Sequence, residues 1–189
     1  MMRMEAELEP LDSARTSAFL MLVIQLKTDH DCLKEKVDAL YERSMSAAAS
    51  PMSSTMFQTL EQLRSESAHL VSELDRHAKW EDQELFPIIT SYFKKKIEPT
   101  MMPSIWVLEK DHELALQFFD TFLELSGSML SMLKRGMERY DVHMAQQLKQ
   151  ATDHLTQGCL ILKGHFHMEE DVLFPLVGEI LTDIDYLFS

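Results

Sequence analysis

The chain has 189 residues, a formal net charge of −13 at pH 7, and only five Gly and six Pro. Its length suits one domain with a buried core, and the scarcity of Gly and Pro favours helix throughout. The acidic balance excludes sequence-independent nucleic-acid binding, which needs clustered Lys and Arg, and no apolar run is long enough to span a membrane. The two cysteines lack the spacing of a zinc site, which predicts a reduced, cytoplasmic protein.

The first predicted helix follows an acidic segment. Residues 1–11 are expected to form a loose tail. Asp12 or Ser13 is the predicted N-cap, because such side chains accept hydrogen bonds from the free amides of a first helical turn. The helix should pass Tyr41 and end within residues 44–54, which are rich in Ser and Ala and contain a proline.

Prolines mark the ends of the next two predicted helices. The second begins near Thr55 and should bend or end around Pro87, because proline lacks the amide hydrogen of the helix ladder. Pro103 suits the first turn of the third helix, which should stop near Gly136.

The fourth helix is expected from about Asp141 to Pro175, and residues 178–189 predict a short C-terminal docking helix. The predicted fold class is therefore all-α. It is an antiparallel, up-down-up-down four-helix bundle over residues 12–177.

Apolar residues recur along each predicted helix in alternating steps of three and four, the pattern of a bundle core. The His and Glu residues that share these inward positions are His30, His77, Glu81, Glu84, His112, His165 and Glu169. Glu84 is expected to be only a helix-end carboxylate. The other histidines fall outside the pattern and are predicted to face solvent or lie at the rim: His69, His143, His154 and His167.

Two motifs occur twice in the chain. A His-x-x-x-Glu followed by Leu-Phe-Pro spans residues 77–87 and returns in the same register at 165–175, and Asp-His followed by an acid occurs at 29–31 and 111–113. This recurrence indicates two copies of one unit, each with a lone His followed by a His-x-x-x-Glu. Each predicted loop falls near the midpoint between successive inward histidines, so an up-down-up-down bundle would bring the four imidazoles to one level.

Repeated histidine and glutamate are typical of metal sites. An unpaired polar group in a core costs roughly 2–7 kcal/mol, and a bare carboxylate more, whereas a central cation supplies each group with a partner. Taken singly, a core histidine is more often a hydrogen-bonded structural residue, but the duplication and the common level favour a metal. Six ligands are more than one tetrahedral zinc ion takes, and they suit two adjacent metal ions. A combination of imidazole and carboxylate ligands is suited to iron, and it is less distinctive of manganese or zinc.

These motifs make the chain resemble the hemerythrin-like family, the His-His-Glu cation-binding domain, over essentially its whole length. The resemblance implies a four-helix bundle with two iron ions that binds dioxygen or nitric oxide. It also implies the ligand set: one iron takes His30 and His77, the other takes His112 and His165, and both share the bridging residues Glu81 and Glu169.

The chain departs from oxygen-carrying hemerythrins, which supply a fifth histidine one turn from His112. Leu108 and Leu116 stand there instead, and the second bridge, Glu169, follows its His by four residues, where the carriers have an Asp five residues on. Such a centre resembles the branch linked to nitric oxide handling. We therefore favour a binding protein for nitric oxide or dioxygen, in stress response or sensing, over an enzyme. A di-iron oxidase, peroxidase or nitric oxide reductase is the alternative, and an iron-sensing regulatory domain is a third.

Overall fold

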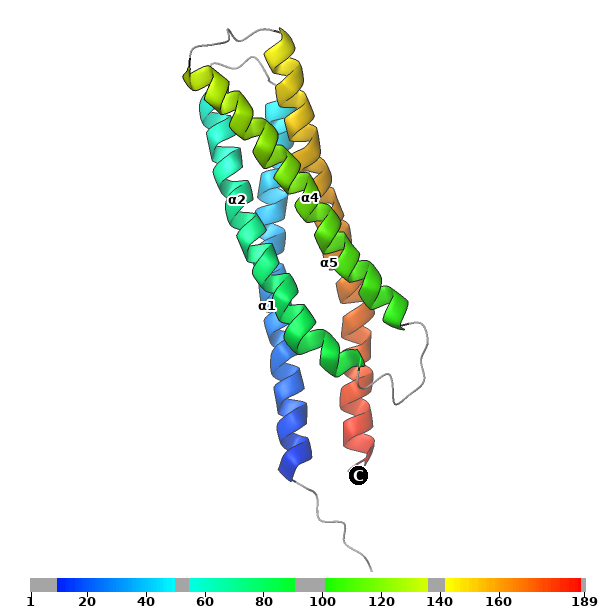
Figure 1. Ribbon diagram of the computed structural model, residues 1–189. Helices are drawn as coiled ribbons and strands as arrows, with labels where there is room; N and C mark the ends of the chain where they lie inside the picture. The colour runs from blue at the N-terminus through cyan, green and yellow to red at the C-terminus, as the bar shows by residue number, and fades with distance from the viewer. Residues whose placement is uncertain (1–9, 50–54, 91–100, 136–141, 188–189) are drawn as a thin grey trace, which may run out of the picture.

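The computed structural model describes residues 10–49, 55–90, 101–135 and 142–187, which are helical apart from turns at Thr55 and Arg135, with no strand among them. The long helices are α1 (Pro10–Ala49), α2 (Met56–Trp80), α4 (Met101–Lys134) and α5 (Val142–Leu187), and η1 (Glu81–Leu85) is a π-helical segment that continues α2. The all-helical class is thus confirmed (Figure 1). Among the described helices, none combines the length and the apolar character needed to cross a bilayer.

The first helix is longer than the sequence suggested. It begins at Pro10, ahead of the expected N-cap, and continues through the Ser-rich segment to Ala49. The hydroxyls of Ser44 and Ser46 donate to the carbonyls of Tyr41 and Glu42, one turn earlier, so they find their partners within the helix. The expected loose tail falls on residues 1–9, outside the described residues, and on the first turn of α1.

The second helix does not end at Pro87 but continues to residue 90 through the wider turn of η1. Within η1 the amide of Phe86 donates to the carbonyl of Glu81, the five-residue spacing of a π-helix. This extra residue rotates the helix face, so Leu85 is buried and Glu84 is exposed. The prediction that Glu84 lies on the inward face is therefore wrong, because the three-and-four spacing does not hold through a π-helical turn.

The last helix is continuous. α5 runs through Pro175 to Leu187, so the helix expected over residues 178–189 is joined to the fourth one without a break in its described part. Pro175 is exposed, as is Asp171, whose carbonyl loses its partner amide, so water can reach the interrupted hydrogen bond.

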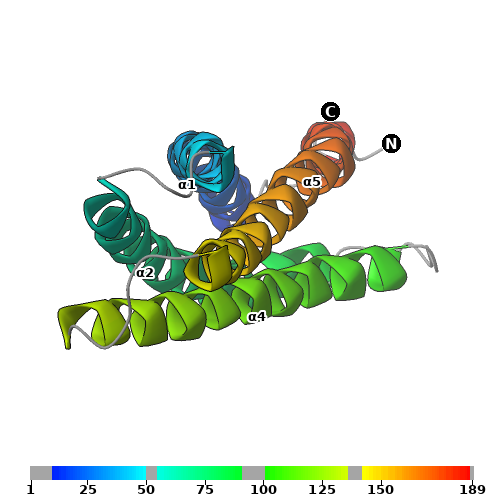
Figure 2. The same cartoon turned by 90° about the horizontal axis from the view of Figure 1, so that it is seen from above.

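The four long helices pack in a ring, because α1 contacts α2 and α5, and α4 contacts the same two. Seen from above, α4 crosses the others at an angle (Figure 2). The core is divided into two apolar clusters. The larger contains Leu33, Leu74, Ala115 and Leu162, and the smaller contains Leu26, Leu85, Leu108 and Leu173.

Candidate metal centre

The polar site lies between the two apolar clusters on every helix. On α1, His30 stands between Leu26 of the smaller cluster and Leu33 of the larger. The same order holds around His77 and Glu81, around His112, and around His165 and Glu169. All four helices therefore contribute an imidazole at one level, and α2 with η1 and α5 each add a carboxylate.

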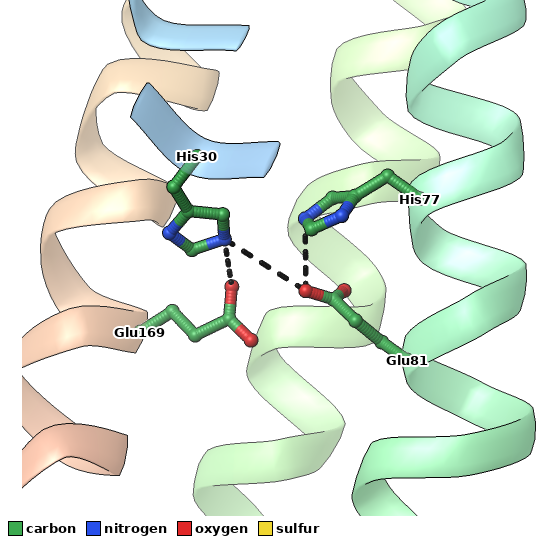
Figure 3. Close-up of side chains that lie close together, drawn as sticks. All are labelled: His30, His77, Glu81 and Glu169. Atoms are coloured by element: carbon green, nitrogen blue, oxygen red, sulfur yellow. Dashed lines mark ion pairs between the residues drawn. The ribbon is translucent and has the colours of Figure 1, made fainter. Parts of the chain in front are cut away.

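The structure brings all six predicted residues together in the core, where none of them is more than 6% exposed. His30, His77, Glu81 and Glu169 form one group of potential ligands, and Glu81, His112 and His165 form a second; within each group the potential ligand atoms lie within 4.8 Å of one another. Glu81 belongs to both groups, as a bridge would. The site can therefore be described as two adjoining pockets of nitrogen and oxygen atoms (Figure 3 shows the first).

Glu169 also connects the two groups. Its Oε2 lies 3.1 Å from Nε2 of His30, on α1, and 3.4 Å from Nε2 of His165, one turn earlier on α5. A single carboxylate oxygen thus faces one imidazole from each half of the repeat.

Glu81 occupies the corresponding place on η1. Its Oε1 lies 2.9 Å from Nε2 of His77 and 3.8 Å from Nε2 of His30 (Figure 3). Its Oε2 lies 3.6 Å from Nε2 of His112. Glu81 is the first residue of η1. π-Helical turns inside α-helices are frequently found at functional sites.

Despite these short distances, the inward atoms have no hydrogen-bond partner of suitable geometry. Such unsatisfied buried atoms are rare in native proteins. Those of the site are Nε2 of His30, His77, His112 and His165, Nδ1 of His77 and His165, and both carboxylate oxygens of Glu81 and Glu169. These nitrogen and oxygen atoms converge but do not form hydrogen bonds with one another. A bound cation would give each of them a partner, so the residues present fit a metal.

The charges of the site are unequal. Burial by itself lowers the pKa of His30, but its contacts with Glu169 and Glu81 outweigh burial and raise that pKa to about 9. For His112, burial together with the neighbouring charge of His165 lowers the pKa to about 3. Burial tends to raise the pKa of Glu169, but His165 and His30 hold it well below its usual range.

Aromatic rings cover the imidazoles. The buried ring of Phe166 lies 4.8 Å from that of His30 and 5.4 Å from that of His165. Trp80 stacks on His77 at 6.1 Å. A small cavity of about 40 Å³ between α1 and α2, lined in part by Asp29 and Cys32, reaches His77. A cavity of this size has room for water or a diatomic molecule.

The histidines outside the heptad pattern are not part of the site. His69, His143 and His167 are exposed, and His154 is half-buried, with its ring 5.7 Å from that of Phe118. This agrees with their predicted places at the surface or rim.

Sequence reasoning missed one contact of the site. Nδ1 of His30 lies 3.2 Å from Oε1 of Glu170, and Nζ of Lys34 lies 2.5 Å from the same oxygen. The only sequence signal was the acid that follows each motif Glu, Glu170 here and Asp82 in the first copy. That signal did not point to a partner on another helix.

Comparison with protein-family models, curated proteins and solved structures found no match to this chain. Its function therefore has to follow from the chemistry of the site.

Proposed function

We propose that this chain is a di-iron protein, similar to hemerythrin-like proteins, that binds nitric oxide or dioxygen. The observation that carries the proposal is the set of buried nitrogen and oxygen atoms without partners that converge between the two apolar clusters. Four imidazoles and two carboxylates are too many donors for one tetrahedral ion. They suit two ions, each with two imidazoles and a share of both carboxylates.

The donor set favours iron. Imidazole with carboxylate is a common environment of non-haem iron, and it is less distinctive of manganese or zinc. Two adjacent cations repel each other, and bridging carboxylates offset that repulsion. Held in this way, the metals would supply positions at which a small ligand binds.

The antiparallel, up-down-up-down topology of the hemerythrin-like bundle is part of the same proposal. The colour order in Figure 1 supports it, since α1 and α4 run toward the upper end and α2 and α5 run back. Such a path brings the inward histidines of all four helices to a single level.

Binding is favoured over catalysis by what surrounds the site. Apart from the six candidate ligands, the described residues place no buried acid, base or nucleophile against the centre; Glu84 is exposed, and Glu170 is held by Lys34. The protein is expected to act in the cytoplasm, in stress response or sensing. A di-iron oxidase, peroxidase or nitric oxide reductase would instead consume nitric oxide or peroxide when loaded with iron.

A metal count with an electronic spectrum tests the proposal directly. Protein reconstituted anaerobically with Fe²⁺ should hold two iron ions per chain, and its visible spectrum should change on exposure to air and to nitric oxide. Fewer than one iron per chain after removal of loosely bound metal, with no spectral change, would refute the centre.

Replacing an inward histidine should remove metal, whereas replacing an outer one should not. His77→Ala or His165→Ala is expected to abolish binding of at least one metal, because no other inward-facing histidine lies within a turn of either residue. The matched controls are His69→Ala and His143→Ala, at exposed positions on the same helices. Elemental analysis measures the outcome, and equal loss in both sets would contradict the assignment.

Metal affinity should rise with pH. His30, with a pKa of about 9 in the metal-free protein, carries a proton at neutral pH that the metal must displace, whereas His112, with a pKa of about 3, is already neutral. One displaced proton makes the affinity rise about tenfold per pH unit between roughly pH 7 and pH 9. Chelator competition with Zn²⁺ across this range measures how the affinity changes with pH. An affinity that does not change with pH would contradict the proposal that His30 is a metal ligand.

A further inference from the structure

We infer that Glu170 is a positioning residue for His30 and that it strengthens metal binding on the His30 side of the centre. The inference rests on the proposed metal centre and adds to it an inequality between its halves that the duplicated sequence does not predict.

The contact between His30 and Glu170 fixes the imidazole. A carboxylate oxygen only accepts, so Nδ1 of His30 must donate across the 3.2 Å to Oε1 of Glu170. The opposite nitrogen, Nε2, then faces Glu169 at 3.1 Å, where a metal would take its lone pair. A ligand imidazole whose second nitrogen donates to a carboxylate is held in one orientation and is a more basic ligand.

Lys34 holds Glu170 in place. It lies one turn after His30 on α1, and its Nζ is 2.5 Å from the oxygen that accepts from His30. The exposed fractions of the Lys34 and Glu170 side chains are 34% and 19%, so this ion pair is only partly screened by solvent. Glu170 on α5 is thus held by two residues of α1.

The other half of the repeat lacks this arrangement. Asp82 corresponds to Glu170 in the first motif, and Leu116 stands four residues after His112 where Lys34 stands four after His30. Within the described residues Asp82 has no hydrogen-bond or ion-pair partner. Its side chain is one methylene shorter than that of Glu170, and it lies in the π-helical turn of η1.

The second nitrogens of His77 and His165 have no hydrogen-bond partner. Nδ1 of His77 is 3.9 Å from Oδ2 of Asp29, beyond hydrogen-bond range, and Nδ1 of His165 is buried without a partner. His30 is therefore the one ligand imidazole, among the described contacts, with a hydrogen-bonded outer nitrogen. Partners of this kind typically change metal affinity by about 10- to 100-fold.

A Zn²⁺ titration by chelator competition tests the inference with a diamagnetic probe. Wild type is expected to bind two ions. Glu170→Ala should weaken one of the two affinities by about 10- to 100-fold, and Glu170→Gln should recover most of that loss because its amide oxygen can still accept from Nδ1. Asp82→Ala, at the equivalent position of the other half, is the matched control and should leave both affinities unchanged.

A second measurement separates positioning from a general effect on folding. In the nitrogen-correlated proton spectrum of His30, the Nδ1–H should be protected from exchange in wild type and Glu170→Gln and lost in Glu170→Ala, with all variants folded by circular dichroism. Wild-type affinity in Glu170→Ala, or an equal loss in Asp82→Ala, would overturn the inference and leave the metal centre standing. If wild type takes up no Zn²⁺, the metal centre itself fails, and the Nδ1–H of the metal-free protein still decides whether Glu170 positions His30.

Discussion

Glu169→Ala is expected to hold at most one metal ion and, in the presence of metal, to melt well below wild type. The carboxylate faces Nε2 of His30 at 3.1 Å and Nε2 of His165 at 3.4 Å, one from each potential metal group. Its loss removes a ligand from both ions at once, together with the negative charge that offsets their repulsion. A terminal ligand such as His77 would serve only one ion.

The size of the effect follows from linkage between binding and folding. A metal at 1,000 times its dissociation constant stabilises the fold by about 4 kcal/mol. For a chain of this size each kcal/mol changes the melting temperature by about 2–4 °C, so losing one ion should lower it by roughly 10 °C. His30 and His165 would also lose the carboxylate that faces them in the core.

Elemental analysis and thermal melting with and without metal measure both parts. Glu113→Ala is the control, because Glu113 follows His112 directly but is exposed and pairs with Lys110. The control should keep two ions and the full difference in melting temperature between the loaded and metal-free forms. A Glu169→Ala protein that does the same would remove the bridging role.

The inward face of each helix could be predicted because heptad spacing depends only on local geometry. Spacing alone put His30, Glu81 and Glu169 among Leu and Phe, and the structure buries all three. The predicted loops fall near the midpoints between successive histidines, which likewise predicted that the imidazoles lie at the same height in the bundle. The rings of His112 and His165 indeed lie 4.1 Å apart. These features needed no knowledge of side-chain contacts between helices.

Other features could not be predicted, for two physical reasons. A π-helical turn has no distinct sequence spacing, so Glu84 was placed inward and the rotation that buries Leu85 was missed. The role of Glu170 depends on how α5 is rotated against α1, because its partner lies 140 residues away in the chain. The continuation of α5 past Pro175 depends on that proline facing solvent, which the sequence pattern did not indicate.

The reduced, iron-loaded protein is expected to react readily with nitric oxide, giving a new visible absorption band, and to be oxidised irreversibly by oxygen. Leu108 and Leu116 flank His112 where a further histidine would complete the coordination of one ion, and neither can act as a ligand. At least one iron should thus keep a vacant or water-filled position. The cavity of about 40 Å³ that reaches His77 offers small molecules and water a way toward the centre.

Reversible binding of oxygen needs a dry, fully ligated pocket, because water and protons at the metal promote net electron transfer. A centre with an open position on one ion and a cavity that reaches His77, a ligand of the other ion, lacks that protection, whereas nitric oxide needs only the open position. Anaerobic titration with nitric oxide, followed in a separate sample by exposure to air, measures both reactions. The band should be absent from zinc-loaded protein and retained in Cys32→Ser, which removes the exposed thiol that lines the cavity. An oxygen complex that is long-lived and gives up its oxygen intact under vacuum would instead indicate a carrier, and the interpretation of Leu108 and Leu116 would then be wrong.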